Sequence, residues 1–390
     1  MTKHLVWLML GTLALAGCRS NQKVAAKSPV TPLPVGSFAR AWTAPLELGS
    51  DVVREMHLTG DRLFVYTGRN TSCVVNRNSG HLDSFSDVQV GGGVLKAPVM
   101  MGDYIVYPTT STLEIFNLRG RPLKSIPLDS PLSASGVGAG NIVYVGENKL
   151  GGYGRLCAID ITRNAAVPRW GILTRGAITG RPAYFEKIIY CGSENGSLMA
   201  VTEDGGVAWP GQQNSIFKAG GAFMSDIHAD DTGVYAANTD TKLYCLERNS
   251  GRIKWQYYAT AALKTGPSVT SSMVYQWVPG RGLAAIDKNN GGFNREPRWI
   301  IRDAEQFLSE DETHSYLRRR DNTLIAVDKE TGKVQFTSRS KSFNFFASNT
   351  QDAMIYACTR SGILVAIRPV LNAGEAGELV LNVEPLPLGG

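Results

Sequence analysis

The sequence has few of the residues that build metal centres and reactive nucleophiles. It contains five histidines in 390 residues, and no two of them stand at a spacing typical of metal ligands. It has no Cys-x-x-Cys pair, no Gly-x-Ser-x-Gly motif and no phosphate-binding loop. No catalytic, cofactor-binding or metal-binding residue can therefore be assigned from motifs. We expect a protein that is not an enzyme and that carries no cofactor.

Strong helix signals and concentrated charge are also scarce. Residues 303–312 (DAEQFLSEDE) form the one segment that predicts a short helix. The net charge of +6 is spread along the chain, and no basic run with interleaved aromatic residues occurs, so nucleic acid is not an expected partner. Glycine and hydrophobic residues, by contrast, are abundant. The 42 glycines favour many tight turns, and a hydrophobic content of 43% suffices for a large core.

The first 17 residues predict a lipoprotein signal peptide. Lys3 and His4 provide a short positive region, and residues 5–16 form an apolar stretch that is too short to span a bilayer. Residues 15–18 (LAGC) resemble the lipobox of bacterial lipoproteins, which implies that Cys18 is the lipid attachment site. An ordinary secretory peptide that happens to have a cysteine near its end is the alternative.

Residues 18–38 are interpreted as the lipidated cysteine and a flexible tether. The segment is polar and contains three prolines. Several acyl chains on Cys18 would hold the protein stably at a bilayer, where a single chain would be marginal. Arg19 stands where an aspartate retains lipoproteins of enteric bacteria in the inner membrane. We therefore expect the periplasmic face of the outer membrane, with the outer leaflet of the inner membrane as the alternative.

The remaining five cysteines lie inside apolar, strand-like runs. Their number is odd and their spacing suggests no disulfide framework, although an exported protein can form disulfides. We expect them to be buried as small hydrophobic residues. They are Cys73, Cys157, Cys191, Cys245 and Cys358.

A short apolar run with a tyrosine recurs eight times at intervals of 37–46 residues, at Tyr66, Tyr107, Tyr144, Tyr190, Tyr235, Tyr275, Tyr316 and Tyr356. A second apolar run follows after a turn rich in Gly, Asn, Asp and Ser, which is typical of a hairpin. A further turn and an aromatic strand come next. A period of about forty residues with four short strands is the size of a propeller blade. The sequence therefore predicts an all-β fold, an eight-bladed β-propeller of four-stranded antiparallel blades over residues 39–371.

The turn and the aromatic residue indicate the type of repeat. Residues 245–255 (CLERNSGRIKW) fit the pattern Ala-x-Asp-x-x-Thr-Gly-x-x-x-Trp, and residues 326–336 (AVDKETGKVQF) fit it with Phe for Trp. This pattern resembles the tryptophan-docking repeat of pyrroloquinoline-quinone-type propellers, which implies that a ring from one blade packs against the next. The Asp and Thr-Gly positions then serve a tight turn. The docking aromatics implied by the resemblance are Trp42, Trp170, Trp209, Trp255, Trp299 and Phe336.

Closing the ring requires a strand from outside the eight repeats. Trp42 lies in an isolated aromatic segment before the first repeat, and we expect this segment to complete the last blade. The alternative is that residues 378–384 supply the strand, so residues 372–390 are either a tail or a closing strand. Closure matters because an open ring would leave unpaired strand edges.

Two groups of charged residues lie outside the repeat pattern. Residues 309–314 (SEDETH) are the densest cluster of titratable side chains, and we interpret them as a solvated loop between blades. Lys96, Arg181 and Lys264 precede three of the tyrosine runs. That position predicts that they lie near one entrance of the central channel, where they would attract an anion weakly.

The whole chain resembles the BamB family of outer-membrane assembly lipoproteins: a lipobox, a proline-containing tether and one propeller. The resemblance implies a membrane-anchored scaffold that binds other envelope proteins, including the outer-membrane barrel assembly machinery. Two alternatives stay open: an envelope propeller that binds another protein or a polysaccharide, and a degenerate quinoprotein dehydrogenase. Dehydrogenases of this repeat type carry a vicinal disulfide against the quinone, and no Cys-Cys pair occurs here.

Overall fold

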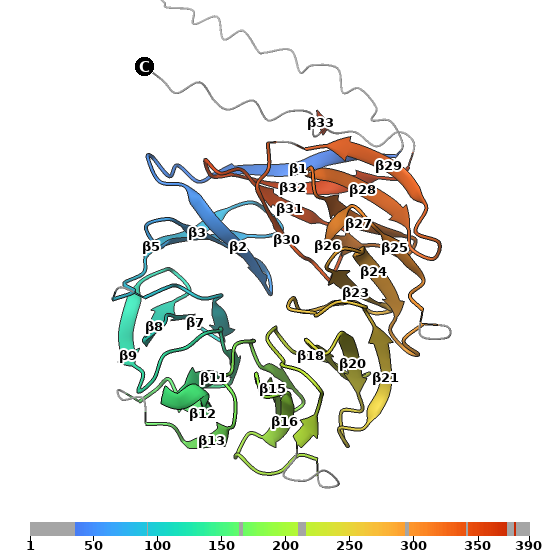
Figure 1. Cartoon of the computed structure of the whole chain (residues 1–390). Coiled ribbons are helices and arrows are strands. Elements are labelled where there is room, and N and C mark those ends of the chain that lie inside the picture. Colours follow the sequence, from blue (N-terminus) through green and yellow to red (C-terminus); the bar gives the residue numbers. More distant parts are fainter. Residues whose placement is uncertain are drawn as a thin grey trace, which may run out of the picture. The chain divides into compact units, whose positions relative to one another are not determined.

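The computed structural model describes residues 36–91, 93–163, 167–209, 216–292, 296–340, 342–372 and 378–379. The chain divides into two compact units, residues 1–31 and 32–390, and every described residue belongs to the second. In this unit the described residues form eight antiparallel sheets that follow one another around a ring (Figure 1). They contain one short 3₁₀ turn, Leu150–Gly152, and no other helix. The predicted fold class, an eight-bladed β-propeller, is confirmed.

The first four blades each consist of four consecutive strands. Blade 1 comprises β2 (Val53–Thr59), β3 (Arg62–Thr67), β4 (Thr71–Asn76) and β5 (Leu82–Asp87). Blade 2 comprises β6 (Val99–Met101), β7 (Tyr104–Pro108), β8 (Thr112–Asn117) and β9 (Pro122–Pro127). Blade 3 comprises β10 (Val137–Ala139), β11 (Ile142–Asn148), β12 (Gly154–Asp160) and β13 (Trp170–Thr174). Blade 4 comprises β14 (Ala183–Phe185), β15 (Ile188–Gly192), β16 (Ser197–Thr202) and β17 (Ile216–Lys218).

The next three blades repeat this order, and the eighth combines both ends of the described chain. Blade 5 comprises β18 (His228–Ala229), β19 (Val234–Ala237), β20 (Lys242–Leu246) and β21 (Ile253–Tyr258). Blade 6 comprises β22 (Ser268–Val269), β23 (Met273–Val278), β24 (Gly282–Asp287) and β25 (Trp299–Ile301). Blade 7 comprises β26 (Ala304–Glu310), β27 (His314–Arg319), β28 (Thr323–Asp328) and β29 (Val334–Arg339). Blade 8 comprises β30 (Phe345–Ala347), β31 (Ile355–Cys358), β32 (Ile363–Val370), β1 (Ser37–Pro45) and β33 (Glu378–Leu379).

The middle strands of the blades are buried on both faces because a neighbouring blade covers each side of the sheet. β23 reads MVYQWV and β28 reads TLIAVD, and both are buried along nearly their whole length. Uninterrupted apolar runs are typical of strands that are buried on two faces. Along the fourth strands, buried and exposed side chains alternate instead. In β21 (IKWQYY) only Trp255 and Tyr257 are buried, which is the period of two of a strand with one face toward solvent.

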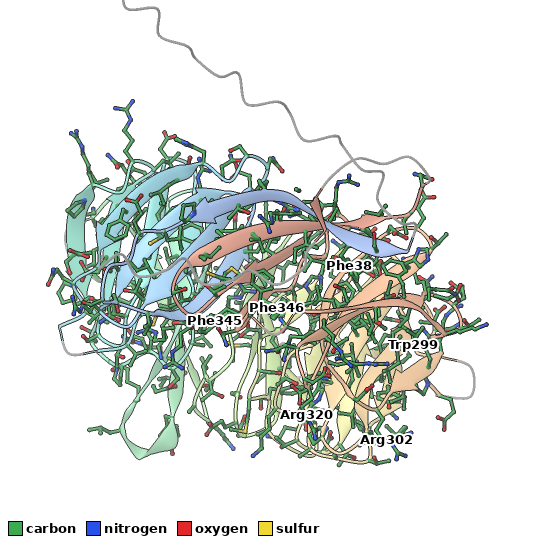
Figure 2. The ribbon with its side chains drawn as sticks, turned by 90° about the horizontal axis from the view of Figure 1, so that it is seen from above. Phe38, Trp299, Arg302, Arg320, Phe345 and Phe346 are labelled. Carbon is green, nitrogen blue, oxygen red and sulfur yellow. The ribbon has the colours of Figure 1, made fainter. Side chains whose placement is uncertain are left out.

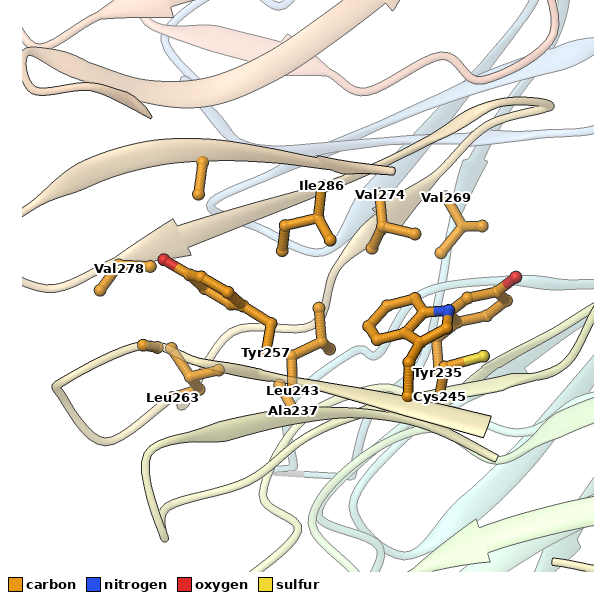
Figure 3. Close-up of a cluster of buried hydrophobic side chains, with 13 residues drawn as sticks. Tyr235, Ala237, Leu243, Cys245, Tyr257, Leu263, Val269, Val274, Val278 and Ile286 are labelled. Atoms are coloured by element: carbon orange, nitrogen blue, oxygen red, sulfur yellow. The ribbon is translucent and has the colours of Figure 1, made fainter. Parts of the chain in front are cut away.

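The core is divided among the interfaces between blades. Between blades 5 and 6, Tyr235 and Cys245 of one sheet face Val274 and Ile286 of the next (Figure 3). All eight tyrosines that mark the repeat are at most 1% exposed. In five blades the tyrosine ring lies 5.8–6.1 Å from the docking tryptophan of the same blade. In these five blades a pair of large aromatic rings packs at the interface and contributes much apolar area.

The N-terminal strand closes the ring. β1 pairs with β32 along its whole length, with a bulge between Arg40 and Trp42, and the two strands lie side by side in Figure 1. The strand of Trp42 is thus the fourth strand of blade 8, and β33 pairs with the other edge of β1 as a fifth. β1 begins at Ser37, inside the segment interpreted as tether.

The helix predicted over residues 303–312 is wrong. The segment contains β26, the first strand of blade 7, which pairs with β27 through two irregularities in register. Its Ala, Glu, Gln and Leu residues are good helix formers, but intrinsic propensity is a weak determinant that tertiary contacts override. Phe307 and Leu308 are at most 2% exposed. The burial of these side chains between blades overrides the local preference.

Candidate functional site

The five tryptophans of the docking set make the same contact. Four lie on the fourth strand of their blade and Trp209 precedes β17 in the chain, and each indole N–H donates to a turn carbonyl of the following blade over 2.6–3.0 Å. The acceptors of Trp42, Trp170, Trp209, Trp255 and Trp299 are the carbonyl groups of Arg77, Glu203, Arg248, Lys288 and Lys329, respectively. These bonds and the buried rings join consecutive blades.

The glycine of the turn makes room for the indole. Gly291 has a φ angle of 75° and Gly332 one of 70°, a left-handed conformation that glycine adopts without a steric penalty. A Cβ atom at Gly291 would lie 2.8 Å from Trp255, and one at Gly332 would lie 2.5 Å from Trp299. Both the backbone and the docked ring therefore require glycine.

The aspartates of the motif hold the same turns. Asp328 accepts hydrogen bonds from the backbone N–H (2.8 Å) and the hydroxyl (2.7 Å) of Thr331, and these bonds lower the pKa of Asp328. The Thr162 hydroxyl and the Arg169 guanidinium lower the pKa of Asp160 to about 2. A general acid or base at neutral pH needs a pKa closer to the working pH. These carboxylates thus act as acceptors in turns.

Phe336 occupies the docking position of blade 7 through apolar contact alone. Its ring centroid lies 5.1 Å from that of Phe38, and a Cβ atom at Gly36 would touch it at 3.5 Å. Phe38, labelled in Figure 2, also meets Tyr316 edge-on at 5.9 Å. This aromatic cluster covers the seam between blade 7 and the closing strand.

In blade 2 a lysine occupies the docking position, which a search for aromatic residues does not find. Lys124 of β9 pairs with Ile115, as Trp255 pairs with Cys245 in blade 5. The Lys124 ammonium donates to the carbonyl of Arg163 in blade 3 at 3.0 Å. Its position and its donor thus match those of the indole groups elsewhere in the ring.

In blade 1 a serine occupies this position. Ser84 lies ten residues after Val74, as Trp255 lies ten residues after Cys245. Val74 pairs with Ser84 across two neighbouring strands of blade 1, as Cys245 pairs with Trp255 in blade 5. A Cβ atom at Gly120 of the next blade would lie 2.6 Å from the Cβ of Ser84. Counting along the motif, rather than looking for a ring, is the signal that finds this residue.

Buried ion pairs accompany the docking contacts. The Lys329 ammonium lies 2.8 Å from Glu310 Oε1, and both side chains are at most 9% exposed. Tyr275 of blade 6 donates to Glu310 Oε2 at 2.6 Å, so the pair also joins two blades. Lys288 forms a similar bond to Asp230 at 2.9 Å. Although burial raises the pKa of Asp230, hydrogen bonds from His228 and Lys288 hold it below its ordinary value.

The interpretation of residues 309–314 as a solvated loop is wrong for the first two residues. Ser309 and Glu310 end β26 and are buried, while residues 311–313 form the turn to β27. A sequence rich in acidic residues suggests solvent exposure, and the partner that permits burial, Lys329, lies nineteen residues further along the chain.

The structure brings two of the three predicted channel cations together. Arg181 and Lys264 line a cavity of about 400 Å³ with Asp226 and His228. The Arg181 Nε atom lies 3.5 Å from Asp226 Oδ2, so this carboxylate, which the sequence interpretation left out, offsets one of the cations. An adjoining cavity of about 270 Å³ shares Arg181 and Asp226 and reaches the first strands of blades 1, 7 and 8. Lys96 lies outside the described linings of both cavities.

An apolar groove of about 460 Å³ opens between blades 3 and 4. One wall consists of Ile172–Arg175, and the other includes Met199 and Val201 of β16 with Val207 and Ile216. Along the described residues, the fourth strand of blade 4 pairs with only part of β16. β17 pairs only with residues 197–199 of β16, and beyond them an isolated bridge joins Val201 to Val207. Leu173 and Val207, one on each wall, are 69% and 61% exposed, whereas Met199 and Val201 are at most 5% exposed.

A long hairpin extends from one end of this blade 3–4 groove. β11 and β12 pair without irregularity up to Asn148 and Gly154, and Gly154 in turn pairs with Thr174 of the groove. At the tip, Leu150 is 98% exposed. Below the tip, Glu147 is 1% exposed and binds the Arg155 guanidinium. This buried carboxylate holds the base of the hairpin in place.

Comparison with known proteins agrees with the geometry. A family model described as "Outer membrane protein assembly factor BamB" matches residues 110–257 and 211–294. The crystal structure of BamB from Moraxella catarrhalis superposes with a TM-score of 0.64 at 15% identity, covering 85% of this chain and 97% of that one. The crystal structure of the computationally designed Ika8 protein superposes with a TM-score of 0.63 at 13% identity, covering 83% of this chain and 98% of that one. No curated protein sequence matches the chain.

The chain is a pyrroloquinoline-quinone-like β-propeller that resembles BamB. At these identities the two solved structures bear on the fold alone. Within the described ranges of the propeller, no three His, Cys, Asp or Glu side chains gather closely enough to hold a metal ion. The same ranges contain no helix of the length and hydropathy needed to cross a bilayer. Cys18, the predicted lipid attachment site, lies outside the described residues.

The five cysteines inside the propeller are free and buried, as the sequence predicts. Burial raises the pKa of each thiol to about 12, in Cys73, Cys157, Cys191, Cys245 and Cys358. Because the thiolate is the reactive form, thiols with such values are inert at neutral pH. The cysteines therefore act as small core residues.

Proposed function

We propose that this propeller is a non-catalytic scaffold that docks on the outer-membrane β-barrel assembly machinery and is held at the periplasmic face of the outer membrane by lipid on Cys18. The matching family model, described for BamB, and the BamB-like fold support this role. The lipobox at residues 15–18 supports the anchor. Because a fold does not specify a function, the binding role must rest on a particular surface.

The exposed apolar surface of blades 3 and 4 is the observation that carries the proposal. Leu150, Tyr153, Leu173 and Val207 are between 53% and 98% exposed, and they lie along or beyond the blade 3–4 groove. Single exposed apolar residues are common, whereas several beside one groove are typical of an interaction site. Apolar and aromatic side chains that enter pockets supply most of the energy of protein binding.

The binding test replaces one residue of the groove wall. Leu173→Glu is expected to weaken binding to the purified periplasmic domains of the β-barrel assembly protein by at least about tenfold, because a charge would enter an apolar contact. The measurement is biolayer interferometry with the otherwise intact mature chain. Leu123→Glu is the matched control, since Leu123 is 51% exposed on the fourth strand of blade 2. Equal binding by both variants, or no binding by the parent protein, would contradict the proposal.

The anchor is tested by Cys18→Ala. This variant is expected to leave the membrane pellet for the soluble periplasmic fraction and to lose labelling by a fatty-acid analogue, because the acyl chains provide the hold on the bilayer. Fractionation in high salt and the labelling assay check the two outcomes. A variant that stays in the pellet and is labelled like the parent protein would show that Cys18 is not the anchor.

A further inference from the structure

Blade 1 carries a further cavity, which the docking role does not use. It has a volume of about 660 Å³ and lies between the segment that joins β1 to β2 and the end of β5. Its lining is mainly polar and contains the side chains of Asp51, Arg69, Asn70, Asp87 and Gln89. This volume is within the range of about 300–1,000 Å³ that is usual for small-ligand sites.

Phe85 forms part of the wall and has no packing role in the ring. The docking position of blade 1 belongs to Ser84, and along β5 the residues Ser84 and Ser86 are buried while Phe85 is exposed. The Phe85 side chain is 52% exposed. A flat apolar ring beside a polar cavity offers a stacking surface to a ligand that has an apolar face.

Three polar side chains of the cavity keep unused hydrogen-bonding capacity. Asp87 accepts from the Thr71 hydroxyl at 2.8 Å through one oxygen, which leaves the other oxygen available. Asn70 accepts from Arg54 through its carbonyl oxygen at 2.8 Å, which leaves its NH₂ group as a donor. Among the described residues, the Gln89 amide has no hydrogen-bond partner. The cavity thus presents both donors and acceptors.

The walls of the cavity are held in place by other contacts. Asp51 accepts the backbone N–H of Val52 at 2.8 Å and that of Arg69 at 3.3 Å, and these bonds tie the two loops together. The backbone N–H of Val88 donates to the backbone carbonyl of Asn70 at 3.2 Å. A site that is already ordered loses less conformational freedom on binding.

The charges of the cavity disfavour an anionic ligand. Two carboxylates, Asp51 and Asp87, face one guanidinium, Arg69, so the lining carries a net charge of −1. The geometry points to a binding site for a neutral pyranose oligosaccharide. The C–H face of one sugar ring would pack on Phe85, and its hydroxyl groups would exchange hydrogen bonds with Asp87, Asn70 and Gln89.

The test titrates the mature protein with chitotetraose and with cellotetraose, two neutral probes, and records heats of binding and amide chemical shifts. We expect a dissociation constant of about 1 mM or lower for at least one probe, and a loss of about tenfold or more in Phe85→Ala and in Asp87→Ala. Leu123→Ala, which removes a similarly exposed side chain from the fourth strand of blade 2, is expected to leave the affinity unchanged.

Three outcomes would overturn the inference: no binding of either probe, binding that Phe85→Ala does not weaken, or tighter binding of an anionic glycan such as tetragalacturonate. The inference is independent of the docking role. Phe85→Ala is expected to bind the β-barrel assembly protein as the parent protein does, and Leu173→Glu is expected to keep its affinity for the sugar probe.

Discussion

Replacing Trp255 by alanine is expected to lower the free energy of unfolding by about 3–5 kcal/mol, the usual cost of removing a large buried aromatic side chain. Trp255 is 7% exposed, and its ring centroid lies 6.0 Å from that of Tyr235. Its N–H also satisfies the carbonyl of Lys288 at 2.8 Å. The substitution would leave a cavity between blades 5 and 6 and an unpaired carbonyl at its edge.

Urea unfolding of two further variants, followed by circular dichroism, shows how much of this loss comes from the hydrogen bond and how much from the burial of the ring. Trp255→Phe keeps a ring but removes the donor, and we expect a loss of about 1–2 kcal/mol. Phe85→Ala removes an aromatic residue that is 52% exposed on a fourth strand, and we expect a loss of about 1 kcal/mol or less. If Trp255→Ala were no less stable than Phe85→Ala, the docking contact would contribute nothing beyond surface packing.

The fold could be predicted from the sequence because its information is local and repeated. The spacing of the eight tyrosines reports the blade length, and every one of those rings is buried. The turn of residues 245–255 predicts a glycine with positive φ, and Gly251 has a φ angle of 68°. Repetition reinforces such signals, since a pattern that is weak in one blade becomes clear over eight.

Features that depend on contacts between distant segments could not be predicted in this way. Glu310 is buried because Lys329 and Tyr275 lie beside it, and neither partner can be predicted from residues 309–314. The same contacts between blades turn residues 303–312 into a strand in spite of their helix-forming composition. Lys124 takes the place of an aromatic residue because its ammonium reaches a carbonyl in the corresponding turn of the next blade, that of Arg163.

The blade 3–4 groove could not be predicted from the sequence either, for a different reason. Its apolar wall residues look like ordinary strand residues, and among the described residues β17 pairs with only part of β16. A sequence reports that Leu173 and Val207 are apolar, but it does not report that they are 69% and 61% exposed beside this groove.

Lys329→Met is expected to lower the free energy of unfolding by about 3–5 kcal/mol, because removing one partner of a buried ion pair leaves the other charge without compensation. Glu310 is 9% exposed, and its remaining described contact would be the Tyr275 hydroxyl at 2.6 Å. Burial and the Glu310 carboxylate raise the pKa of Tyr275 far above its ordinary value, so the tyrosine stays a neutral donor and cannot replace the ammonium. The carbonyl of residue 329 still accepts the Trp299 N–H in the variant, so the docking contact itself is kept.

The double variant Lys329→Met/Glu310→Gln distinguishes a lost ion pair from lost packing. Both charges are absent from it, the methionine keeps most of the lysine stem, and the glutamine still accepts from Tyr275. We expect the double variant to recover most of the stability that Lys329→Met loses, since replacing a buried pair by neutral groups is often close to neutral. Urea unfolding of the parent protein, both single variants and the double variant completes the cycle and yields the coupling energy. Additive losses in the two single variants would mean that Lys329 and Glu310 contribute independently and that the ion pair itself has no coupling energy.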